Sequence, residues 1–384
     1  MEPQPAPART AARAVTGVTG ARRRPLAVAA GALLAVGLLA GCGVRLEAPP
    51  AGEPVPDSLE VVRRTAVADA LLVADGAEAA LEGVPTDRER LVAELTRIAA
   101  ASREQAEALG GEYDSGLASD PPTGSQSSSW DTATPADVVQ ALDDAAARSR
   151  TAAGSTDDGP LARLLASIGA AQTVSGERLA TLLEVPGPDV VAPRVPTPSG
   201  SDGANPEGAP SPGLPSGEAT EEGNDDTEDD APDDAQDDQE PDEQAVPEGL
   251  TAHDLSTLVV SEDATRYALQ LRAAIGSGRT RERLLERVEV HAQRADAWAA
   301  VAGTQGDEDD PRRAAYAVPR VADQGDDALV LDLEDDLATD YASLVGTTAA
   351  GSRAVLVDLL VDSAVALDDW GAEPEPFPGL PEQE

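Results

Sequence analysis

Apolar residues recur at helical spacing in eight segments of this chain, four on each side of an acidic, proline-rich stretch. One such stripe, on the second segment, is formed by Leu91, Leu95, Ile98, Ser102, Ala106 and Leu109. Only 2% of the residues are aromatic, so any core must be built from Ala, Leu and Val, a composition that favours packed helices over sheets. The spacing predicts helices at 58–82, 87–109, 135–151, 158–184, 252–276, 280–303, 325–347 and 352–371.

Four amphipathic helices close one four-helix bundle, so the sequence predicts an all-α fold with two bundles in tandem. Two local signals mark where helices begin. Thr86, with Glu89 three residues later, fits a capping box. Thr134 before Pro135 fits an N-cap followed by proline at the first helical position. A weak internal repeat supports two bundles of one design, because the string TAAGS at 151–155 recurs at 348–352.

The N-terminus has the pattern of a targeting segment. Five arginines precede an apolar run from Pro25 to Ala40, which is too short for an ordinary spanning helix. The run closes with the lipobox residues Leu39, Ala40 and Gly41 before Cys42, the only cysteine, which resembles the end of a bacterial lipoprotein signal peptide. We therefore expect lipidation of Cys42 and attachment to the outer face of the cytoplasmic membrane. The arginine pair at 23–24 leaves general secretory and twin-arginine export both open.

Changes in composition divide the chain into five parts. The predicted boundaries are a signal peptide at 1–41, a tether at 42–56, an N-terminal helical bundle at 57–185, a linker at 186–249 and a C-terminal four-helix domain at 250–384. The linker is so rich in proline and acidic residues that it has almost nothing to bury, and we expect it to be disordered. A linker of this length also predicts that the two bundles are independent.

Charge and missing motifs exclude several function classes. The chain has 71 acidic residues against 28 basic ones, all arginine, and its net charge of −43 excludes nucleic-acid partners. One cysteine and two histidines are too few for a disulfide framework or a Cys/His zinc site. A phosphate-binding loop, a dinucleotide fingerprint and a nucleophile elbow are all missing from the sequence. No catalytic motif is intact, so the sequence predicts neither an enzyme nor a cofactor.

The second half resembles the ferritin-like domain of unknown function 4439 found in actinobacterial lipoproteins. The resemblance rests on SEDATRYA (261–268), HAQRADAW (291–298), AAYAVP (314–319), LEDDLATDYASLV (333–345) and the closing segment from Trp370 to FPGLPE (377–382). It implies a four-helix bundle for this half. The first half fits the same architecture but carries none of these strings.

Ferritin-like di-iron proteins bind metal through a Glu from each of two helices and a Glu-x-x-His from each of the other two. That pattern is broken here. His291 has Val288 in place of the required Glu, and His253 has Leu250. The first half contains no histidine. The sequence thus lacks a standard di-iron motif.

A polar cluster inside the second bundle remains, formed by Glu262, His291, Glu334 and Asp362. The predicted inward stripes include Glu262, His291 and Asp362, whereas Glu334 lies at the edge beside the inward-facing Leu333. This cluster is either an unconventional site for one divalent metal or a hydrogen-bonded network without metal, which Tyr267, Arg294 and Tyr341 could join. The network is the favoured interpretation.

These observations together predict a lipid-anchored envelope protein whose bundles serve as a non-catalytic scaffold or binding module. Its expected partners are the membrane, through Cys42, and a protein of the cell envelope. The alternative is a metal-binding or metal-dependent protein with its site at His291.

Overall fold

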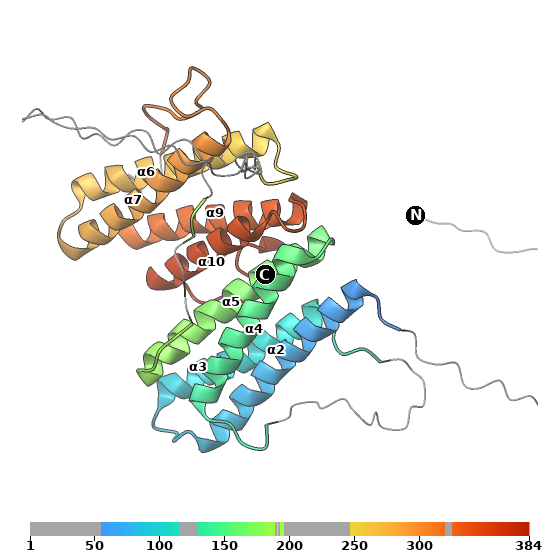
Figure 1. Ribbon diagram of the computed structural model, residues 1–384. Helices are drawn as coiled ribbons and strands as arrows, with labels where there is room; N and C mark the ends of the chain where they lie inside the picture. Colours follow the sequence, from blue (N-terminus) through green and yellow to red (C-terminus); the bar gives the residue numbers. More distant parts are fainter. Residues whose placement is uncertain are drawn as a thin grey trace, which may run out of the picture. The chain divides into compact units, whose positions relative to one another are not determined.

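The computed structural model describes residues 55–114, 130–188, 190, 193–195, 246–318 and 325–383. Every regular element in these ranges is helical (Figure 1), which confirms the predicted all-α fold. Each predicted helix is found, with its ends within four residues of the prediction. The helices are α2 (Ser58–Gly83), α3 (Glu89–Ala108), α4 (Pro135–Ser155), α5 (Gly159–Leu183), α6 (Ala252–Ile275), α7 (Gly278–Val301), α9 (Asp326–Thr347), α10 (Ala354–Asp369) and the short 3-10 helix η1 (Pro381–Gln383).

One of the two predicted helix starts is confirmed. The Thr134 side chain accepts a hydrogen bond from the backbone N–H of Asp137, and the Asp137 carboxylate accepts one from the Thr134 N–H, so α4 begins with a capping box. The box predicted at Thr86 is wrong. Helix α3 begins two residues later than that box requires, with Arg88 as its N-cap, because Pro85 to Arg88 form a separate turn closed by the Arg88 N–H and the Pro85 carbonyl.

In the first half, residues 55–195, helix α2 packs on α3 and on α4, and α4 packs on α5. Alanine supplies much of this core, so the helix backbones can approach closely. Trp130 packs against α2 and donates a 3.0 Å hydrogen bond from Nε1 to the Leu72 carbonyl. Gly76 makes room for the ring, since a Cβ there would lie 2.7 Å from Trp130 Nε1.

In the second half, residues 246–383, α6 packs on α7 and α9, and α9 packs on α10. The connection after α7 folds back over α6. Its Tyr316 donates a 2.6 Å hydrogen bond to Asp263 and lies 5.8 Å from the Tyr267 ring, measured between centroids. None of the helices that the structure describes has both the length and the hydrophobicity needed to cross a bilayer.

The two halves are not independent, contrary to the prediction from linker length. Val55–Glu384 forms one compact unit, and α5 contacts both α9 and α10. One hydrophobic cluster includes Leu165 and Ile168 of α5 together with Leu356 and Leu360 of α10. Gly159 and Gly346 pass so close that a Cβ on Gly159 would overlap the Gly346 carbonyl oxygen. The halves associate because each leaves an apolar helix face that its own helices do not cover. The composition of the linker gives no information about these faces.

Polar contacts reinforce this junction. Ser167 donates to the Pro378 carbonyl at 2.8 Å, and Gln105 donates to the Pro376 carbonyl at 3.1 Å. The two TAAGS strings also meet there, since the Gly351 N–H donates to the Gly154 carbonyl at 2.7 Å. Arg353, buried beside them, donates to the carbonyls of Ala153 and Thr156. The junction therefore joins the same position of the repeat in both halves.

Cutting the chain between its halves should leave them associated. We expect that a specific protease site introduced at Ser216–Gly217 can be cleaved without separating the fragments on size-exclusion chromatography, because the apolar junction holds them. Substitution of Gly159 by valine in the cleavable chain supplies the contrast, since its side chain would overlap Gly346. Fragments that separate after cleavage, with Gly159 intact, would show that the halves are independent.

Candidate functional site

Four helices of the second half direct polar side chains toward one another. Helix α6 supplies Glu262, from the buried stripe that includes Leu258, Thr265 and Leu269. Helix α7 supplies Arg287, His291 and Arg294, which at spacings of four and three residues share one face. Helix α9 supplies Glu334 and Tyr341, two turns apart, and α10 supplies Asp362. We call these seven residues the charge network.

The centre of the network is His291, whose side chain is fully buried, as are those of Glu262 and Glu334. Its Nδ1 lies 2.7 Å from Glu262 Oε2, and its Nε2 lies 3.1 Å from Glu334 Oε1. Carboxylates only accept hydrogen bonds, so both ring nitrogens can be satisfied only if both carry a proton. The geometry therefore calls for an imidazolium.

Two arginines complete the network. Arg287 forms a bidentate ion pair with Glu334, with Nε 2.5 Å from Oε1 and Nη2 2.9 Å from Oε2. Its Nη2 also lies 2.8 Å from Asp362 Oδ2, and Arg294 Nη2 lies 2.6 Å from the same oxygen. Tyr341 donates to Glu262 Oε1. The three carboxylates and three cationic groups thus form one continuous set with balanced charge.

The pKa shifts follow from this arrangement. Burial acts to lower the pKa of His291, but the charge of Glu334 and the hydrogen bonds to both glutamates outweigh it, so the pKa is raised above 6.5. Burial acts to raise the pKa of Glu334, yet the charges of Arg287 and His291 hold it well below its ordinary value. The pKa of Asp362 is also lowered, because Arg287 and Arg294 outweigh its burial. Each shift favours the charged form.

The network is closed to solvent at its centre and reaches the surface at one end. Arg287 and Asp362 retain 12% and 18% side-chain exposure, whereas His291 and Glu334 retain none. The two exposed members line a depression of about 230 Å³ beside Arg283 and Trp370. Arg283 stacks on the Trp370 ring, 3.9 Å from guanidinium carbon to centroid. Water thus has access to the Arg287–Asp362 end, away from the histidine.

Most of the residues predicted from sequence lie in this network. Glu262, His291, Glu334 and Asp362 are brought together, and Arg294 and Tyr341 join them. Tyr267 was wrongly included: it packs on Tyr316, because a residue five positions after Glu262 lies on a different face of α6. Glu334 was wrongly placed at the edge. It is fully buried and Leu333 only partly, since the true stripe of α9 runs through Val330, Glu334, Leu337 and Tyr341.

Sequence reasoning missed Arg287. The signal was its position four residues before His291, which puts both side chains on the same face of α7. Arginine is usually a surface residue, so it was not placed among the inward-facing side chains of this segment. In the structure Val288 is only partly buried and packs at the edge of a small cluster with Leu284 and Trp370.

The donor set does not fit a di-iron centre. Glu334 and Asp362 are paired with guanidinium groups, and Glu262 is paired with His291 and Tyr341. Both nitrogens of His291 face carboxylate oxygens, so neither is aimed at an open position. Among the described residues no group of three or more His, Cys, Asp or Glu is arranged to hold a metal ion. The chemistry of this site is charge pairing.

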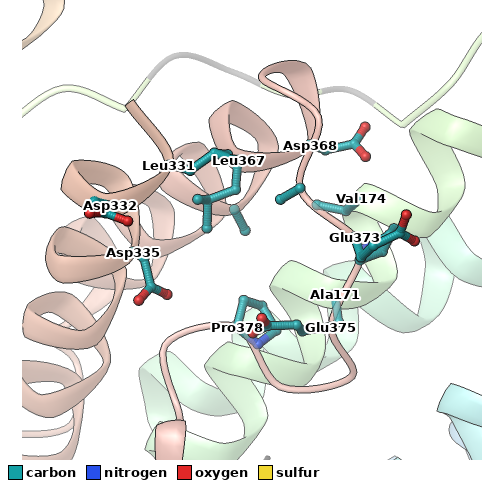
Figure 2. A pocket seen from close by; sticks show the side chains of 13 residues that line it. Ala171, Val174, Leu331, Asp332, Asp335, Leu367, Asp368, Glu373, Glu375 and Pro378 are labelled. Carbon is teal, nitrogen blue, oxygen red and sulfur yellow. The ribbon is translucent and has the colours of Figure 1, made fainter. Parts of the chain in front are cut away.

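A separate pocket of about 220 Å³ lies where α5, α9, α10 and the C-terminal segment meet (Figure 2). Ala171, Val174, Leu331 and Leu367 provide apolar walls. Its ionisable lining residues are all acidic: Asp332, Asp335, Asp368, Glu373 and Glu375. Asp368 is paired with Arg178 at 2.5 Å.

The N-terminal predictions lie outside the described residues. These are the signal peptide at 1–41, the lipobox residues Leu39, Ala40 and Gly41, lipidation of Cys42 and most of the tether at 42–56. Residues 196–245, the greater part of the predicted linker, lie outside them too.

Comparison with known proteins supports only the C-terminal half. No curated protein and no solved structure matches this chain. The family model described as Domain of unknown function (DUF4439) matches residues 255–382. This range spans α6 to the C-terminal 3-10 helix and includes all seven residues of the charge network. The second half of the chain is therefore a helical domain of unknown function.

Proposed function

We propose that this protein is a lipid-anchored envelope lipoprotein whose helical bundles act as a non-catalytic binding or scaffold module. The observation that carries the proposal is the pairing of every carboxylate in the charge network with arginine, histidine or tyrosine. A guanidinium group stays protonated near neutral pH and takes part in no redox reaction there. We therefore infer that the network serves to fix the relative positions of four helices.

A ferritin-like architecture is part of this proposal. In each half four helices form the core, with a long connection between the second and the third. A four-helix bundle of this kind carries polar side chains from facing helices into its centre. The balanced charge network is the arrangement we expect once cationic side chains supply the positive charge that metal ions supply in ferritin-like di-iron proteins.

Anchorage is proposed from the sequence around Cys42. A single acyl chain gives only marginal membrane binding, and maturation of a bacterial lipoprotein supplies at least two. Anchorage through lipid would leave the helical part outside the cytoplasmic membrane, where it could contact a protein of the cell envelope.

Metabolic labelling tests the anchor directly. Full-length protein made in a bacterium supplied with an alkyne-bearing fatty acid should carry the label and partition with the membranes. Cys42→Ala should abolish both, and because the chain has one cysteine the label has no other thiol to occupy. Membrane partition that survives in Cys42→Ala would contradict the proposed anchor.

Metal content separates the scaffold from the alternative of a metal-binding protein with its site at His291. A form beginning at Val55, which keeps the whole compact unit, would be incubated with Fe(II), Mn(II) and Zn(II), desalted and analysed by elemental mass spectrometry. We expect no stoichiometric metal, because arginine and the protonated His291 already neutralise the carboxylates. About one equivalent in the wild type, lost in His291→Ala, would instead establish the metal function; His253→Ala is the matched control, since His253 is exposed on α6.

A further inference from the structure

A groove of about 410 Å³ runs between α2 and α4 of the first half. This volume lies within the usual range of ligand pockets, about 300–1,000 Å³. Eleven residues line the groove, and they come from the first three turns of α2 and the last three of α4: Val61, Val62, Thr65, Ala66, Asp69, Ala147, Arg148, Ser149, Thr151, Ala152 and Ser155.

All four hydroxyl groups of this lining donate hydrogen bonds within the protein. Thr65 donates to the Val61 carbonyl at 2.8 Å, Thr151 to the Ala147 carbonyl at 2.8 Å, and Ser155 to the Thr151 carbonyl at 2.9 Å, each one helical turn back along its own helix. Ser149 donates to Gln172 Oε1 of α5 at 3.2 Å. What the two threonines offer to the groove is therefore their methyl groups, which join the side chains of Val62, Ala66 and Ala152.

The only ionisable lining residues neutralise each other. Arg148 forms a bidentate ion pair with Asp69, with Nε 2.8 Å from Oδ2 and Nη2 3.0 Å from Oδ1. The pair spans from α4 to α2 and leaves neither charge available for a ligand group of opposite sign. An occupant of the groove must consequently be uncharged along its length.

Exposed apolar side chains also lie near the start of α2. Val61, which lines the groove, is 49% exposed, and Leu59 is 39% exposed. Val55, three residues before the start of α2, follows Cys42 by only 13 residues. A stretch of this length spans no more than about 45 Å even when fully extended. A lipid-anchored chain therefore holds this apolar surface within reach of the bilayer.

We propose that the groove between α2 and α4 binds a single aliphatic tail of a membrane lipid. The tail lies along the valine and alanine side chains, while its polar head stays at the open end in water. The inference rests on the proposed anchorage, because a protein held at a membrane meets lipid tails at high local concentration.

A fluorescent fatty acid tests the groove without the anchor. The form beginning at Val55 lacks Cys42, so binding by this form depends on the groove alone, and a failed lipid anchor would not affect it. Titration with cis-parinaric acid, below the concentration at which it forms micelles, should show saturable binding with about one molecule per chain. Oleic acid should displace the probe, whereas phosphocholine, a headgroup without a tail, should not.

A matched pair of variants locates the site. Ala147→Phe puts a large side chain at the groove and should weaken binding about tenfold or more. Ala100→Phe adds the same side chain at an exposed position of α3, away from the groove, and should leave the affinity unchanged. Circular dichroism would establish that both variants stay helical. Equal affinity in the two variants, or no saturable binding by the wild type, would overturn the proposal.

Discussion

Substitution of Glu334 by glutamine is expected to lower the free energy of unfolding by about 3–5 kcal/mol, the usual cost of removing one partner from a buried ion pair. The amide keeps the size of the side chain but removes its charge. It leaves Arg287 and His291 facing a neutral group at the centre of the network, where Glu334 has no solvent exposure. Urea unfolding of the form beginning at Val55, followed by circular dichroism, measures the change.

The control is Glu282→Gln, the same chemical change on the exposed face of α7. Surface substitutions of this kind usually change stability by less than about 0.5 kcal/mol. If Glu334→Gln is as stable as Glu282→Gln, the network does not hold the second half together, and the scaffold role assigned to it is wrong.

Stability should fall as the pH rises above neutrality. The pKa of His291 is higher in the folded protein than its ordinary value of 6.5, because Glu334 and Glu262 hold the proton. A group of this kind contributes its full stabilisation below the unfolded pKa and loses it as the pH rises through the folded pKa. The groups that face His291 are Glu262 of α6, Arg287 and Arg294 of α7, Glu334 and Tyr341 of α9, and Asp362 of α10.

This dependence can be assigned because the chain contains only two histidines. Urea unfolding at a series of pH values should show the loss in the wild type and in His253→Gln, but not in His291→Gln. Imidazole NMR signals, assigned with the same two variants, should show that the pKa of His291 lies above 6.5, so that its ring stays protonated at higher pH. A His291 ring that loses its proton at or below pH 6.5 would contradict the imidazolium.

Residue pattern was sufficient to predict most of the helices and their buried faces. The predicted stripe from Leu91 to Leu109 is buried as expected, because a period of 3.6 residues is a property of each segment alone. Capping was less certain. The predicted box at Thr86 failed where a turn over Pro85 to Arg88 delayed the start of α3.

The partners of the charge network were only partly predictable. Spacing on one helix places Arg287 and Arg294 beside His291, but their pairing with Glu334 and Asp362 depends on how four helices are turned about their axes. A shift of one residue was enough to exchange Glu334 and Leu333 in the prediction for α9. Helical periodicity places the buried face of a helix only to within about one residue. An ion pair, by contrast, requires its nitrogen and oxygen atoms to lie within 4 Å of each other.

The sequence by itself determined that this chain is helical, where its helices lie, and which residue types can enter the centre of the second half. Only the tertiary structure decided that arginine neutralises the buried carboxylates and that α5 packs on α9 and α10. The physical reason is the range of the interactions. Helix formation depends on residues three and four positions apart, whereas contacts such as Arg353 with Ala153 join positions 200 residues apart in the chain.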